Sequence, residues 1–455
     1  MERAVVGKVM LCLVSLAILC CAASAWAQGE AGEMEKKRAA EMALQPGMVL
    51  DRTTAALAKD LLPEELLRHY EQGGYRNEIG AWPSDRETMG ADFESQTKRN
   101  AEELALDAAG SIIEKATGKQ PPYIYGTPFP SIDPNDPQAG VKILWNHYYN
   151  YWWNGNNHDV VDLVWVNPTG VDRTVTQDTY FKYYDGGPPD FRSADNPKNL
   201  LVQFIAITTT PADLYGTAAL GWRYRDAGKR DSVWAYVPAL RRVRQVSPAN
   251  SSDGFLGSDM SQDDGPFFDG KPEDFQWKLV GEAEGLRMVD PFRLRGEHET
   301  VPIPGGGWRA VLRDIPYYGY EDKSWTGLAW APIAMSLVRR KVWIIEGVPK
   351  DPQYLYGKIQ LWVDQGNWQG AYNRKFSWQG ELLNVLQVDG GPPSKTDGEY
   401  TTWDSPSAVA QIAENIKMNR VTLVSFGKKD DHPVEYHIPL EASFFEYQTL
   451  YRFGK

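Results

Sequence analysis

The pattern of apolar and polar positions is helical in the early part of the chain. Residues 28–120 are rich in Ala, Glu, Lys and Leu. Pro63 suits the first position of a helix, and the two acidic residues that follow it suit the first turn. Gly73-Gly74 would end this helix. A second helix is expected from Gln96 to Thr117. Its apolar face carries Leu104, Ala108, Ile112 and Ala116.

Beyond residue 120, aromatic and β-branched runs alternate with Gly, Pro, Asn and Asp, a pattern typical of strands. A first group of strands is expected at Lys142 to Tyr149, Val160 to Val166, Thr174 to Tyr184, Leu200 to Thr208, Thr217 to Tyr224 and Ser232 to Val237. A second group is expected at Val338 to Gly347, Gly357 to Asp364, Tyr372 to Trp378, Leu382 to Val388 and Val421 to Phe426. Turn sequences at 167–170 and 226–228 join neighbours, which favours antiparallel meanders.

Three further stretches stand out in this pattern. Residues 238–307 are irregular and rich in Asp, Gly and Pro, which indicates a long insertion or a lid. Ser405-Pro406 opens a helix that we expect to run to Asn419. The sequence Asp-Gly-Gly-Pro-Pro occurs at 185–189 and 389–393; a duplicated β unit would explain it, but chance reuse of turn residues is favoured. We expect an N-terminal helical segment over 28–120 and one β-rich domain over 121–455.

The first 27 residues have the pattern of a cleaved signal peptide. Arg3 and Lys8 precede an apolar run from Val9 to Ala23, and Ala25-Trp26-Ala27 offers a cleavage site before Gln28. A membrane anchor is the alternative, but the run is shorter than the about 20 residues that a spanning helix needs. The three cysteines are Cys12, Cys20 and Cys21, so the expected mature chain has none. We therefore expect a periplasmic protein without disulfides or thiolate metal sites.

Charge and motifs exclude several functions. The net charge is -12, opposite in sign to that of a general nucleic-acid binder. No phosphate-binding loop, dinucleotide fingerprint, nucleophile elbow or zinc-protease motif occurs, so we expect no catalytic residues and no cofactor. Aspartates at 253–264 could hold Ca²⁺, but the EF-hand order is missing, and the simpler interpretation is a solvated acidic loop that could pair with Arg241, Arg242 and Arg244. No metal site is expected. For the six histidines, His69, His147, His158, His298, His432 and His437, we expect surface or hydrogen-bonding roles.

Aromatic residues are in excess, with 17 Trp, 23 Tyr and 15 Phe. Six of them crowd one short segment: Trp145, Tyr148, Tyr149, Tyr151, Trp152 and Trp153. Such residues suit a ligand cavity, a sugar platform or a thick sheet core.

One central motif resembles those of LolA-like lipoprotein-sorting proteins. It runs from Trp234 to Arg244, where a strand ending in Tyr and Pro leads to a basic stretch, and continues at 257–264 with Gly-Ser-Asp-Met-Ser-Gln-Asp-Asp. Weaker motifs at 126–130, 140–146 and 342–364 are similar to those of the exported DUF1329 family within that superfamily, and the resemblance covers Leu44 to Phe453. One departure is Asp264-Gly265, where related loops continue with an acidic and an apolar residue.

This resemblance implies an α+β fold. Its large, curved antiparallel sheet would form a half-open barrel with helices on the concave side. It also implies a carrier or accessory protein that binds a lipid, an acylated molecule or another apolar compound for outer-membrane biogenesis or export. The partners would be that hydrophobic molecule and an inner-membrane exporter or outer-membrane protein. The candidate ligand-binding residues are Trp234, Tyr236, Arg241, Arg242, Arg244 and Asp259. Two alternatives are an exported glycan-binding or glycan-active enzyme, which would use Trp and Tyr surfaces and paired carboxylates, and an outer-membrane barrel, which the helical start disfavours.

Overall fold

The computed structural model describes residues 43–84, 89–192, 195–393, 410–426 and 431–453. Within these ranges the strands form an 18-stranded sheet and a separate hairpin of β3 (Leu104–Leu106) and β4 (Ile112–Glu114). The first meander of the large sheet comprises β5 (Asn157–Asn167), β6 (Gly170–Tyr183), β7 (Leu200–Thr210), β8 (Ala218–Tyr224), β9 (Ser232–Val237) and β10 (Arg242–Val246). The second comprises β11 (Phe275–Val289), β14 (Ser336–Pro349), β15 (Lys358–Asp364), β16 (Gly370–Phe376), β17 (Leu382–Val388), β18 (Gln411–Asn415) and β19 (Arg420–Phe426).

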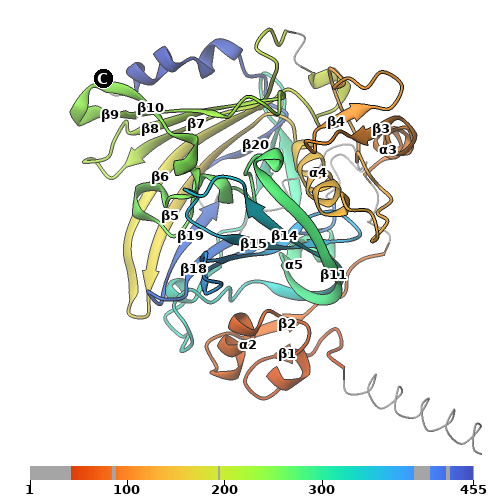
Figure 1. Ribbon diagram of the computed structural model, residues 1–455. Coiled ribbons are helices and arrows are strands. Elements are labelled where there is room, and N and C mark those ends of the chain that lie inside the picture. The colour runs from red at the N-terminus through yellow and green to blue at the C-terminus, as the bar shows by residue number, and fades with distance from the viewer. Residues whose placement is uncertain (1–42, 85–88, 193–194, 394–409, 427–430, 454–455) are drawn as a thin grey trace, which may run out of the picture.

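The two meanders form one curved sheet because β19 pairs with β5 in antiparallel register (Figure 1). At the two ends of this run, β10 pairs with β9 and β11 pairs with β14. Among the described residues β10 and β11 do not pair with each other, so the sheet stays half-open. The expected α+β fold with a large, curved antiparallel sheet is confirmed. Short strands extend it: β1 (Val49–Leu50), β2 (Asn77–Ile79), β12 (Glu299–Pro302), β13 (Trp308–Val311) and β20 (Val434–Tyr436).

Helix α4 (Ala139–Trp152) lies within the curve of the sheet, and we call the sheet surface that faces it the inner face (Figure 1). Its aromatic side chains join one apolar core with inner-face residues of both meanders, such as Leu163 and Leu361. Tyr148 and Trp152 stack with ring centroids 5.5 Å apart. The aromatic-rich segment therefore fills the core. Among the described residues no helix is long and apolar enough to cross a membrane.

The outer face of the sheet is also covered. Residues 44–79, including α2 (Glu64–Glu71), share an apolar core with the second meander and with aromatic residues such as Tyr318 and Trp330. Residues 440–453 cover the outer face of the first meander. Because both faces are buried, several strands are apolar on both sides, which weakens their alternation in the sequence.

Ten of the expected strands and the helix after Pro63 are confirmed, with ends shifted by a few residues. Three other predictions are wrong. The segment 142–149 is part of α4 and not a strand, because a helix buried nearly all round shows no periodicity that would distinguish it. The expected helix from 96 ends early, since α3 (Ala91–Glu103) gives way to the β3–β4 hairpin. Residues 411–415 form β18, whereas 405–409 lie outside the described residues.

The segment 238–307 is less irregular than expected. It contains β10 and the long edge strand β11, which was missed because a bulge at Val280 breaks its alternation. The helix α5 (Pro291–Arg295) follows β11. The remainder, between β10 and β11, crosses the inner face of the sheet. The expected signal peptide lies outside the described residues.

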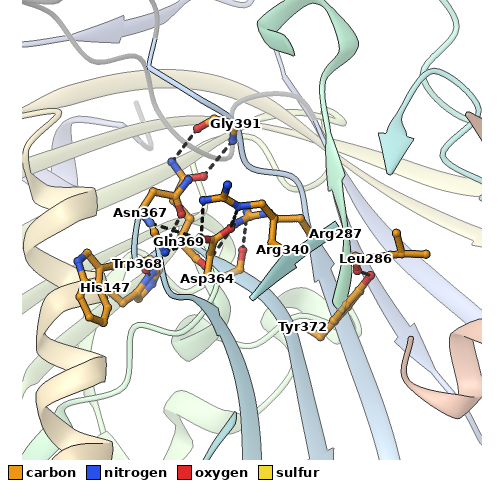
Figure 2. Close-up of polar contacts among 12 residues, drawn as sticks. His147, Leu286, Arg287, Arg340, Asp364, Asn367, Trp368, Gln369, Tyr372 and Gly391 are labelled. Atoms are coloured by element: carbon orange, nitrogen blue, oxygen red, sulfur yellow. Dashed lines mark hydrogen bonds and ion pairs between the residues drawn. The ribbon is translucent and has the colours of Figure 1, made fainter. Parts of the chain in front are cut away.

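A buried polar network ties β11 to β14, β15 and β16 (Figure 2). Arg287 Nη1 donates to Asp364 Oδ2 at 3.3 Å, and Arg340 Nε donates to the same oxygen at 2.8 Å. Gln369 exchanges two hydrogen bonds with the backbone of Gly391, at 3.2 and 2.9 Å. Burial lowers the pKa of the Arg287 guanidinium from its ordinary value, and the Asp364 charge opposes that shift. This network fixes the second Asp-Gly-Gly-Pro-Pro sequence against the sheet.

Glycines in both copies of that sequence allow a close approach. A Cβ on Gly390 would lie 1.7 Å from Arg287 Nη2, and one on Gly186 would lie 2.4 Å from the Cβ of Trp152. Asp185, in the first copy, forms a buried ion pair with Arg225 at 2.6 Å. Packing therefore explains the glycines in each copy without requiring a duplicated unit.

Candidate functional site

A cavity of about 160 Å³ lies on the inner face of the first meander. Its wall comes from β5 to β8, and its other side comes from residues 255–269, which we call the roof segment. The lining residues are Leu163, Gln177, Thr179, Phe181, Phe204, Ala206, Ala219, Phe255, Ser258, Met260, Ser261, Gln262, Gly265 and Asp269. Most of the lining is apolar, so the cavity suits a hydrocarbon chain.

Strand alternation brings the wall residues together. Thr179 pairs with Ala206, and Ala206 pairs with Ala219, so these small side chains form one row across three strands. In the next row, Phe204 lies opposite Gly221. A Cβ on Gly221 would lie 2.0 Å from the Phe204 ring, so glycine is needed for that ring to lie across the strand and form the cavity wall.

Buried acids hold the roof segment on the sheet. Asp259 Oδ2 pairs with Arg420 Nε on β19 at 3.1 Å and accepts from Thr422 Oγ1 at 3.2 Å. Asp264 forms a buried ion pair with Lys375 on β16. Asp263 Oδ2 accepts a hydrogen bond from Tyr354 at 2.8 Å. The expected pairing of these aspartates with Arg241, Arg242 and Arg244 is therefore wrong, because the acids reach across to the second meander.

The end of the cavity beside β8 is acidic. Arg223 Nη1 donates to Asp269 Oδ1, and Arg223 Nε donates to Asp231 Oδ2, both at 2.9 Å. The Asp269 side chain is 23% exposed and lines the cavity. Burial raises the pKa of Asp269 to about 7, although the Arg223 charge opposes this. Burial likewise raises the pKa of Asp263 to about 6.

Gln177 supplies the cavity with a buried amide. This residue is 6% exposed, and its Nε2 has no hydrogen-bond partner among the described residues. It pairs across the sheet with Thr208, whose buried Oγ1 is also without a partner there. Buried polar groups without partners are costly, so this part of the wall is suited to hydrogen bonding with a ligand.

The sequence-predicted ligand residues on β9 do not line this cavity. Trp234 and Tyr236 point to the outer face, where they pack against the C-terminal segment. Their rings lie 6.4 Å from Tyr447 and 5.7 Å from Tyr451, centroid to centroid. Asp259 holds the roof segment in place. Ligand binding by these three residues stays a prediction.

The arginines that follow are exposed. Arg244 pairs with Ala235, which pairs with the cavity-lining Ala219, so Arg244 lies on the inner face two strands beyond the cavity. Arg242 lies on the same face of β10, and Arg241 occupies the preceding turn with a left-handed φ of 46°. The structure therefore separates Trp234 and Tyr236 from Arg242 and Arg244 by placing the two pairs on opposite faces of the sheet.

Histidines and acids form no metal centre in the described part of the chain. The expected hydrogen-bonding role is confirmed for His69, His147, His158 and His432. Of these four, His147 and His432 are buried, and His298 and His437 are buried too, so a surface position does not apply to them. Burial alone would lower the pKa of His158, but hydrogen bonds to Asp178 at 2.7 Å and Glu435 at 2.8 Å raise it to about 9.

Sequence reasoning missed the cavity residues. Gln177, Thr179 and Phe181 alternate with outward-pointing neighbours on β6, so the sequence does place them on one face. It does not show that the roof segment covers this face.

Comparisons with known proteins give one family and several distant relatives. The family model described as "Protein of unknown function (DUF1329)" matches residues 49–451. Uncharacterized protein PA3922 of Pseudomonas aeruginosa is 24% identical over 324 residues, which cover 66% of this chain and only 59% of that protein. A solved DUF1329 family protein from Desulfovibrio piger is 18% identical, with 70% of this chain and 99% of that chain covered and a TM-score of 0.45. A LolA superfamily protein from Nitrosomonas europaea is 13% identical, with coverages of 66% and 94% and a TM-score of 0.38.

Proposed function

The chain belongs to the DUF1329 family, whose description assigns no function, and we propose that it is an exported carrier for a hydrophobic molecule. The observation that carries the proposal is the apolar cavity between the inner face of β5–β8 and the roof segment. Burial of hydrocarbon there would stabilise a bound ligand by about 0.8 kcal/mol for each CH₂.

Periplasmic location is part of the proposal and is supported by the signal-peptide pattern of residues 1–27. The cargo would be a lipid, an acylated molecule or another apolar compound in outer-membrane biogenesis or export. A carrier must receive and release its cargo, so an inner-membrane exporter or an outer-membrane protein would be its partner. No enzymatic activity is included in the proposal.

A glycan-binding or glycan-active protein is the alternative. It would present tryptophan faces to solvent, but Trp378 is the one exposed tryptophan among those that the structure describes, at 47%. The crowded tryptophans Trp145, Trp152 and Trp153 are all buried in the core. The position of the aromatic residues therefore favours the carrier.

The test is to purify the exported protein without detergent and identify bound molecules by native mass spectrometry and solvent extraction. We expect a co-purifying apolar compound, and displacement of a bound environment-sensitive dye by fatty acyl compounds. An empty protein that neither binds the dye nor takes up acyl compounds, but does bind glycans, would refute the carrier function.

A further inference from the structure

Among the described residues that line the cavity, Asp269 is the charged one, and it defines the acidic end. Asp269 lines the cavity with its carboxylate, and the backbone N–H of Asp269 donates to the carbonyl oxygen of Asp263 at 2.8 Å. Asp231 approaches from β9 and Arg223 from β8. Two carboxylates, those of Asp231 and Asp269, therefore face one guanidinium, and this end of the cavity carries a net negative charge when both acids are ionised.

Arg223 is not available to bind an anion. Its Nε and Nη1 donate to Asp231 and Asp269, its Nη2 donates to the backbone oxygen of Asp269, and its side chain is 7% exposed. A carboxylate or phosphate entering this end would meet Asp269 without a free cation to balance it. A like charge within about 6 Å disfavours such a group by at least about tenfold in affinity.

The polar side chains of the lining offer partners for other groups. Asp269 accepts hydrogen bonds at this end of the cavity, whereas the buried Gln177 amide lies toward the other end, opposite Thr208. An ammonium or hydroxyl group can donate to Asp269.

We propose that the buried end of the ligand is cationic or uncharged, such as an ammonium or hydroxyl group, and that the cavity excludes ligands whose buried end is a carboxylate or phosphate. This inference rests on the proposed carrier function and defines its ligand class. Asp269 is the residue that selects the charge.

The test compares decylammonium, decanol and decanoate by dye displacement at about pH 8, where Asp269 with its pKa of about 7 is mainly ionised. We expect decylammonium and decanol to bind at least about tenfold more tightly than decanoate. Asp269→Asn should reduce this ratio to about twofold or less. Asp253→Asn removes an exposed acid near the roof segment and is the matched control for net charge, so it should leave the ratio unchanged.

Decanoate could bind in the reverse orientation, with its carboxylate pointing outward over β10. Arg244→Gln would then weaken the binding of decanoate, and Asp269→Asn would leave it unchanged. That result, or a ratio unchanged in Asp269→Asn, would overturn the selection by Asp269 while leaving the carrier function intact. If none of the three compounds binds the wild-type protein, the carrier function itself fails. Asp231→Asn provides a second variant should Asp269→Asn not fold, since it removes an acid from the same cluster.

Discussion

Filling the cavity is the most direct perturbation of the proposed function. Ala219 lies in the small-residue row of the wall and is half-buried. Leucine at this position adds about three carbons that point from the inner face into the cavity. Because the added carbons extend into the cavity and not into the packed core, we expect little strain and no loss of fold in Ala219→Leu.

The expected size of the effect follows from the cavity volume. At about 30 Å³ for each methylene-sized group, roughly the volume of a water molecule in the liquid, 160 Å³ holds about five groups. At about 0.8 kcal/mol each, they contribute about 4 kcal/mol to the binding of an alkyl chain. A leucine that takes the place of about three of them removes about 2.4 kcal/mol, so the dissociation constant should rise about 50-fold.

The measurement is calorimetric titration with decanol, or displacement of an environment-sensitive dye. Ala235→Leu is the matched control, because Ala235 is next to Ala219 in the same row of the inner face but does not line the cavity. Binding within twofold of wild type in Ala219→Leu would refute the assignment of the cavity as the ligand site. Equal weakening by Ala235→Leu would refute it as well, since the effect would not depend on the cavity.

Three further predictions concern stability and the roof segment. The pKa of His158 is about 9 in the folded protein, against an ordinary value of 6.5. Protonated His158 therefore stabilises the fold fully below about pH 6.5, and this stabilisation is lost as the pH rises through 9. The melting temperature should fall over this pH range more in the wild type than in His158→Gln. Gly390→Ala should reduce the free energy of unfolding by about 3 kcal/mol in denaturant titrations, because the new Cβ would clash with the Arg287 side chain, which is buried and cannot move away. Gly281→Ala is the control, since a Cβ there meets open space and should change the free energy of unfolding little. Asp259→Asn should weaken the contacts of the roof segment with Arg420 and Thr422 by about 1–3 kcal/mol. Hydrogen exchange at 255–269 should therefore accelerate, while β14 to β16 stay protected. Unchanged exchange at 255–269 would show that Asp259 does not hold the segment on the sheet.

The local pattern of apolar and polar residues was sufficient to locate most of the strands. The β5–β6 hairpin has a short turn and clear β-branched runs, so its position depends on neighbours in the sequence. The local pattern was insufficient for α4 and β18, since both are buried on all sides and their apolar residues show no face that distinguishes helix from strand. Burial, which decides such segments, depends on residues far away in the chain.

The candidate site shows the same division. Trp234 and Arg244 are close in sequence and were expected to act together, but the hairpin of β9 and β10 places their side chains on opposite faces of the sheet. The aspartates of the roof segment were identified as important, yet their partners Lys375 and Arg420 lie more than a hundred residues further along the chain.

By itself, the sequence determined the family and most of the antiparallel strands. These features are encoded in local composition, spacing and turns. Only the tertiary structure decided which face of the first meander is roofed, and that Asp269, Gln177 and Ala219 meet in one cavity. The physical reason is that alternation assigns a residue to a face of its strand, whereas the packing of distant segments determines what covers that face.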